Sequence, residues 1–140
     1  MARFTCMLTI ISTLAFSLQS GAAPAGREYC CTVKGGLEGA EYILSFVNSS
    51  HMNFFMTDYL RFASMKSRTP RILVRGIPYD YNATSGAINA TMSSIRTWPV
   101  TLIGSSDMNK LEYNELEDEL RLRMRSKLFK KAAVQTFRRC

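Results

Sequence analysis

The sequence has few of the residues that build catalytic or metal sites. It contains a single histidine, His51, and no cysteine or carboxylate cluster beside it has the spacing of metal ligands. No glycine-rich phosphate loop, no G-x-S-x-G motif and no pair of catalytic carboxylates can be identified. These absences argue against an enzyme. We predict no catalytic residue, no cofactor and no metal site, and expect His51 at the surface near the start of a helix.

Long apolar runs are also missing after the first residues. Arg3 is followed by an apolar segment, 4–18, interrupted only by small or hydroxyl residues, and then by small residues at 20–23. This order is typical of a signal peptide, and the run is shorter than the roughly 18 to 20 apolar residues that span a bilayer. An uncleaved N-terminal anchor is the alternative interpretation.

The signal-peptide interpretation sets the expected domain boundaries. Cleavage near Ala22, or else at Ala25, removes residues 1–22 and leaves 23–140 as one secreted domain. We expect this domain in the secretory pathway, with any membrane association made only through a partner.

The charge balance is basic. The sequence has 18 Lys and Arg residues against 11 Asp and Glu residues, a formal net charge of +7. A basic exported protein favours acidic partners such as glycosaminoglycans, anionic lipid or acidic protein surfaces, and the compartment argues against nucleic acid. Solubility alone is an equally good explanation of the charge.

Three N-glycosylation sequons agree with export. They begin at Asn48, Asn82 and Asn89, and each has serine or threonine two residues later. Because a single sequon arises easily by chance, it is their number in so short a chain that predicts glycosylation. The sequons place these asparagines at the surface.

The mature chain would keep an odd number of cysteines. Cys6 leaves with the signal peptide, so Cys30, Cys31 and Cys140 remain. Adjacent cysteines rarely bridge each other, which favours a disulfide from Cys140 to either Cys30 or Cys31. This disulfide would close a loop of about a hundred residues and stabilise the fold by roughly 4 to 5 kcal/mol. The remaining cysteine could form an interchain disulfide, unless Cys140 is simply a free terminal thiol.

Hydrophobic periodicity predicts helices in the first half of the chain. Segment 37–47 fits either a helix or a strand, and Ser49 or Ser50 could cap a helix over 52–63. The apolar residues that follow helical spacing in that second segment are Met52, Phe55, Met56, Tyr59, Leu60 and Ala63. Basic residues at 66–75 then surround a predicted helix-to-strand turn, and 78–91 reads as an exposed loop.

The longest predicted helix begins at Asp107 and ends near Phe137. Its acidic residues precede its basic residues, an order that suits the helix dipole. Before it, an apolar strand-like segment at 95–103 contains Trp98. The sequence therefore predicts a single α+β domain with two or three helices, a short antiparallel sheet and a long C-terminal helix. The candidate partner-binding residues are Trp98, Leu116, Leu120 and Met124.

The segment Tyr29-Cys30-Cys31-Thr32-Val33, just after the signal peptide, resembles the start of glycoprotein L of gammaherpesviruses. The resemblance implies a short, anchorless, glycosylated envelope subunit. Such a subunit binds the membrane-anchored glycoprotein H, aids its folding and transport, and supports membrane fusion during virus entry. It would reach the virion envelope and the host cell surface through that partner. This sequence departs from the family because only Cys140 follows the adjacent pair, where the family has two later cysteines.

Two other functions fit parts of the same pattern. The adjacent cysteines, the basic charge and the predicted terminal helix also resemble a CC chemokine, so a secreted signalling or immunomodulatory ligand is the main alternative. Chemokine-like chains are shorter and have two later cysteines. A secreted precursor processed at basic sites such as Lys130-Lys131 is a third possibility.

Overall fold

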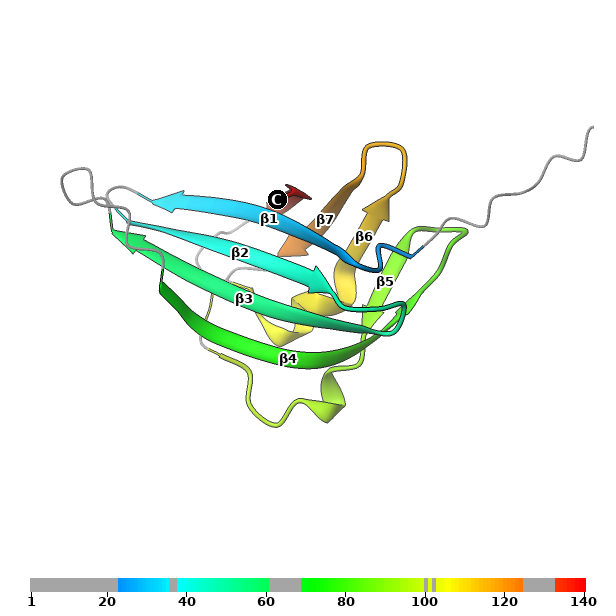
Figure 1. The fold of residues 1–140 in the computed structure, drawn as a ribbon, viewed down its shortest axis with the longest axis horizontal. Coiled ribbons are helices and arrows are strands. Elements are labelled where there is room, and N and C mark those ends of the chain that lie inside the picture. The colour runs from blue at the N-terminus through cyan, green and yellow to red at the C-terminus, as the bar shows by residue number, and fades with distance from the viewer. Residues whose placement is uncertain (1–22, 36–37, 61–68, 100, 102, 125–132) are drawn as a thin grey trace, which may run out of the picture.

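The chain folds into a closed antiparallel β-barrel of eight strands in sequence order (Figure 1). The computed structural model describes residues 23–35, 38–60, 69–99, 101, 103–124 and 133–140. The strands are β1 (Arg27–Gly35), β2 (Glu38–Phe46), β3 (His51–Leu60), β4 (Thr69–Tyr81), β5 (Ala87–Ala90), β6 (Leu111–Asn114), β7 (Glu119–Met124) and β8 (Ala133–Arg139). Two short 3₁₀ helices, η1 (Met92–Ser94) and η2 (Ser105–Lys110), lie between β5 and β6. The predicted signal peptide, 1–22, lies outside the described residues.

The barrel contradicts the predicted α+β class, and the segment 52–63 shows why. Its described part, to Leu60, is strand β3, in which Met52, Phe54 and Met56 point into the barrel while Phe55 lies on the outer face. Apolar residues at 52, 54, 55, 56, 59 and 60 fit both a helical and an alternating pattern, so periodicity did not separate the two. Pairing with β2 on one side and β4 on the other decides for the strand.

The predicted C-terminal helix is also wrong. In the described part of 107–137 the chain forms η2, then the hairpin of β6 and β7, then β8. Alternate residues of β7 face inward, since Leu120, Leu122 and Met124 are buried while Arg121 and Arg123 are exposed. The acidic and basic residues of the described part therefore lie on a turn and on strand faces, where their order along the chain cannot act on the dipole of a long helix.

Three further segments test the predictions. Segment 37–47, for which the sequence allowed both helix and strand, is mostly strand β2. The predicted loop at 78–91 is shorter than expected, because β4 continues to Tyr81 and β5 follows the turn at 82–86. Segment 95–103, predicted as a strand, has no strand in its described residues.

Large side chains point into the described interior of the barrel. The largest that are fully buried are Tyr29, Tyr42, Phe46, Phe54, Phe137, Leu44, Met52, Ile77, Ile88, Ile103, Met108 and Leu120. An eight-stranded barrel is just wide enough for inward side chains to fill it or to leave room for one small ligand. Here aromatic rings occupy that space in edge-to-face and stacked pairs, such as Phe46 against Tyr79 with centroids 5.2 Å apart.

The barrel has unequal sides. Strands β1 to β4 are long and curved, whereas β5 and β6 are short (Figure 1). The turns at 47–50, 82–86 and 115–118 lie together with the end of β8 at one end of the barrel, which we call the rim. The chain between β5 and β6 packs Met92, Ile95 and Trp98 against the core. This segment therefore adds to the core contacts that the short strands β5 and β6 make.

Candidate functional site

The strands β1 and β8 close the barrel with very little pairing. Only Tyr29 with Arg139 and Cys30 with Arg138 are in register, although β1 pairs with β2 along its whole length. The disulfide between Cys30 and Cys140 joins the two strands at this same place. The predicted disulfide of Cys140 is thus formed, and Cys30 is its partner.

Beyond these pairs the two strands continue without pairing to each other. We call residues 31–35 of β1 and 133–137 of β8 the seam. The N–H of Cys140 donates to the carbonyl oxygen of Glu28 at 3.1 Å. Because successive residues of a strand direct their N–H and C=O groups to opposite edges, the even-numbered residues of β1 and β8 direct theirs across the seam. Thr32 and Lys34 on β1, and Val134 and Thr136 on β8, are therefore left without ladder partners there among the described residues.

The seam exposes strand-forming side chains. Thr32 is exposed, Thr136 is partly exposed, and Val134 is 55% exposed, which makes it one of the few large apolar side chains of the described chain that face solvent. An unpaired strand edge of this kind is a template for another strand unless it is covered or blocked. The disulfide holds one end of this edge in place.

Cys31 lies on the opposite face of β1 from Cys30. Its thiol is buried and contacts the side-chain oxygen of Gln135 at 3.6 Å, and burial raises the pKa of the thiol. Because successive residues of a strand point to opposite faces, the adjacent cysteines divide between the core and the disulfide. An interchain disulfide through Cys31 would require the barrel to open.

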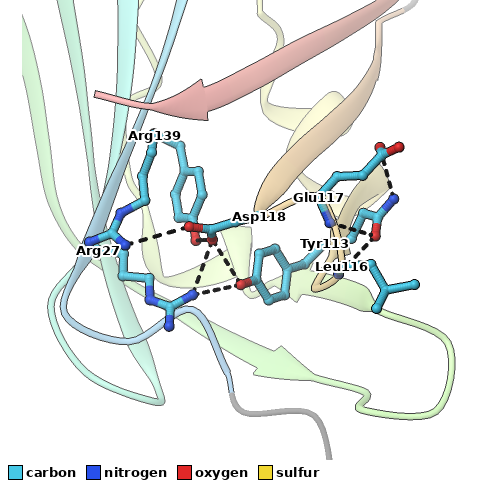
Figure 2. Close-up of polar contacts among 8 residues, drawn as sticks. Arg27, Tyr113, Leu116, Glu117, Asp118 and Arg139 are labelled. Carbon is cyan, nitrogen blue, oxygen red and sulfur yellow. Dashed lines mark hydrogen bonds and ion pairs between the residues drawn. The ribbon is translucent and has the colours of Figure 1, made fainter.

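A polar cluster closes the rim near the same two strands (Figure 2). The carboxylate of Asp118, on the β6–β7 turn, accepts hydrogen bonds from the Tyr29 hydroxyl at 2.6 Å and the Tyr113 hydroxyl at 3.0 Å. Arg27 donates to both Asp118 and Tyr113, and Arg139 lies 3.5 Å from the second carboxylate oxygen. The cluster thus joins β1, β6 and β8 through one carboxylate. Asp118 adopts a φ of 48°, a left-handed conformation that Asp tolerates better than most residues.

The charges of the cluster act on one another. Burial alone would raise the pKa of Asp118, but the hydrogen bonds from Tyr29 and Tyr113 and the charges of Arg27 and Arg139 outweigh it and lower this pKa below its ordinary 3.8. Burial and the hydrogen bond to Asp118 raise the pKa of Tyr29, so its hydroxyl stays protonated and available as a donor.

These shifts predict an acid-sensitive rim. A carboxyl whose pKa is lowered by folding stabilises the protein above its unfolded pKa of about 3.8, and this contribution is lost as the pH falls through the lower folded pKa. We expect Asp118→Asn to lower the melting temperature at pH 7 and the difference from wild type to shrink below pH 4. Thermal unfolding from pH 7 to pH 2 measures this. Asp80→Asn, at an exposed position of β4, is the control, and an equal pH profile for both variants would contradict the prediction.

A shallow groove of about 260 Å³ lies beside the cluster. It runs between the turn at 82–86 and the turn at 115–118, and its lining includes Tyr81, Thr84, Tyr113 and Leu116. Arg121 also borders it but is engaged by Glu117 and Glu119 at 2.8 Å each. The groove is mainly polar.

The outer face of β1 to β4 carries an apolar row. Cys30 lies opposite Ile43, Ile43 opposite Phe55, and Phe55 opposite Leu73. All four side chains face outward and are partly exposed, with Leu73 at 40%. Because the solvent face of an antiparallel sheet is normally polar, an apolar row across four strands marks a surface suited to contact. Hydrophobic periodicity along the sequence does not predict this row, because its four residues come from four different strands.

The four candidate partner-binding residues do not form one surface. Leu120 and Met124 are inside the barrel, so the predicted helical stripe does not exist. Trp98 is partly buried, stacks on Phe54 with centroids 5.1 Å apart, and donates its indole N–H to the Ile103 carbonyl. Only Leu116, on the β6–β7 turn, is almost fully exposed at 98%.

The sequon asparagines lie at exposed positions. Asn48 and Asn82 are in the rim turns, where their side-chain oxygens accept backbone hydrogen bonds from Ser50 and Thr84, and Asn89 is on the outer face of β5. His51 is exposed as predicted, although it begins a strand and not a helix.

Searches for other kinds of site were negative within the part of the chain that the structure describes. No three His, Cys, Asp or Glu side chains there are grouped so that they could hold a metal ion. Among the same residues, no helix has the length and apolar character needed to cross a membrane. Comparisons with known protein families, curated proteins and solved structures gave no match.

Proposed function

We propose that this chain is a non-enzymatic, exported binding subunit whose barrel is completed by an extended segment of another protein at the seam. The observation that carries the proposal is the early end of the β1–β8 ladder, which leaves the edges at Thr32 and Thr136 unpaired. Addition of a strand to such an edge is a common mode of protein recognition, in which backbone hydrogen bonds supply affinity and alternate side chains supply specificity.

The inward side chains favour protein binding over the transport of a small molecule. Tyr29, Phe46 and Phe54 are fully buried and point into the described barrel, where they reduce the space for a ligand. The surfaces that remain for recognition are the seam and the outer faces of the strands.

The partner that we propose is a membrane-anchored glycoprotein of the secretory pathway, which would bring the chain to a membrane. Glycoprotein H is the specific form of this proposal that the resemblance to glycoprotein L implies. The barrel offers another explanation for the adjacent cysteines, because Cys30 forms the disulfide and Cys31 packs in the core. The chemokine-like alternative loses one of its supports, since the terminal helix on which it partly depended is absent from the described residues.

The proposal predicts that proline in the seam blocks partner binding. Thr136 directs its N–H across the seam, so Thr136→Pro removes a donor without removing a ladder bond to β7. We expect the tagged variant to be secreted in folded form but to lose a stoichiometric partner that the wild type retains. The measurement is a pull-down from the producing cells without reductant, followed by mass spectrometry.

A matched variant controls for the introduction of proline. Thr97→Pro makes the same change at an exposed position between η1 and η2, away from the seam, and should retain the partner. Release of the wild type as a lone monomer would contradict the proposal of a binding subunit. Retention of the partner by Thr136→Pro would show that the seam is not the binding site.

A further inference from the structure

Two exposed charges of opposite sign lie beside the apolar row, one on each of its two outer strands. Glu28 on β1 and Arg75 on β4 are both exposed and lie on the rim side of the row. Glu28 is in register with Ser45, Ser45 with Asn53, and the Asn53 side chain accepts a hydrogen bond from the N–H of Gly76 beside Arg75. Neither charged side chain forms an ion pair with a described residue.

This arrangement is complementary to itself. A two-fold axis that runs along the strands between β2 and β3 would place β1 of one copy over β4 of the other. Ile43 would then face Phe55 of the second copy, and Glu28 would face Arg75 of the second copy. The two-fold symmetry would make each of these contacts occur twice in the dimer. Two sheets that pack face to face keep their strands within about 30° of parallel, which brings equivalent rows together.

The predicted glycans leave this surface free. Asn48 and Asn82 lie in turns at the rim, and Asn89 is on β5, so none of the three sequons lies on the central outer face of β2 and β3. The row is also separate from the seam, which begins beyond Cys30 on the other edge of β1. A second copy on the row would leave the seam open to a partner.

We propose that the outer face of β1 to β4 binds a second copy of this chain, with Ile43, Phe55 and Leu73 at the centre of the interface and Glu28 paired with Arg75 across it. The secreted glycoprotein is then a two-fold symmetric dimer. Burial of the apolar row supplies the main stabilisation, and the charge pairs fix the orientation.

Analytical ultracentrifugation of the purified secreted protein over a range of concentrations tests this dimer. We expect Phe55→Ala to raise the dimer dissociation constant by about a hundredfold, because it removes the central apolar contact. Val134→Thr removes an exposed apolar side chain from the outer face of β8, away from the row, and should leave the dissociation constant unchanged.

Charge exchange tests the orientation even if Phe55→Ala folds poorly. Glu28→Arg and Arg75→Glu should each weaken the dimer about tenfold, and the double variant should restore it. A monomer at all concentrations, or a dimer that neither Phe55→Ala nor the single reversals weaken, would overturn the inference. These outcomes are independent of the seam, since a monomeric chain that still captures its partner would leave the proposed function intact.

Discussion

Removal of the Cys30–Cys140 disulfide should lower the free energy of unfolding by about 4 to 5 kcal/mol. The two cysteines are 110 residues apart, so the disulfide restricts most of the unfolded chain. It also lies at the place where the barrel closes through only two residue pairs. A loss of this size is a large part of the roughly 5 to 15 kcal/mol that stabilises a typical domain. Urea unfolding of Cys30→Ser/Cys140→Ser against wild type measures it.

Cys31→Ala provides the control for this experiment. It removes a buried sulfur from the same strand without touching the disulfide, and should destabilise the protein by only about 1 kcal/mol. Equal stability of the double variant and the wild type would show that the β1–β8 contact does not depend on the covalent bond. A loss in Cys31→Ala as large as that in the double variant would contradict the pairing of Cys30 with Cys140.

Substitution of Gly86 by alanine should destabilise the protein by about 3 kcal/mol or more. Gly86 has a φ of 75° at the end of the β4–β5 turn, and its carbonyl accepts the Tyr113 N–H at 2.7 Å. An added Cβ would collide with the Tyr113 carbonyl oxygen, which is backbone and cannot rotate away. The substitution would therefore separate β5 from β6, a junction with only two pairs in register.

Gly76→Ala separates the collision from the backbone strain. Gly76 has a similar φ of 66°, but an added Cβ would meet no atom within 4 Å. We expect a loss of about 1 kcal/mol from the left-handed conformation alone. Thermal or urea unfolding compares the two variants, and equal losses would contradict the proposed contact between Gly86 and Tyr113.

The local features that depend on few residues could be predicted from the sequence. The sequence favoured a disulfide from Cys140 to Cys30 or Cys31, and strand geometry now explains the choice, because only Cys30 faces outward toward β8. The exposure of His51 and of the three sequon asparagines also followed from residue type.

The fold class could not be predicted from periodicity. The segments 52–63 and 107–137 contain enough apolar residues to satisfy a helical series, whereas their strands are stabilised by partners distant in sequence, such as Leu120 opposite Phe137. Leu116 and Leu120 illustrate the consequence. Four residues apart, they would share a helix face, but one lies on an exposed turn and the other in the core.

The proposed binding surfaces were missed for a related reason. The apolar row joins Cys30, Ile43, Phe55 and Leu73, which come from four strands and have no common spacing along the chain. The seam is the part of β1 and β8 in which no ladder hydrogen bonds join the two strands, and no residue type in the sequence indicates where such bonds are missing. Only the three-dimensional pairing pattern reveals either surface.

Hydrogen exchange at the seam tests the central claim most directly. In the free protein the amides of Thr32 and Thr136 should exchange at least about a hundredfold faster than those of Cys31 and Gln135, which point into the ladders with β2 and β7. In the complex recovered from the producing cells, both seam amides should become as protected as their neighbours. Equal protection in the free protein, or no gain of protection in the complex, would contradict the account.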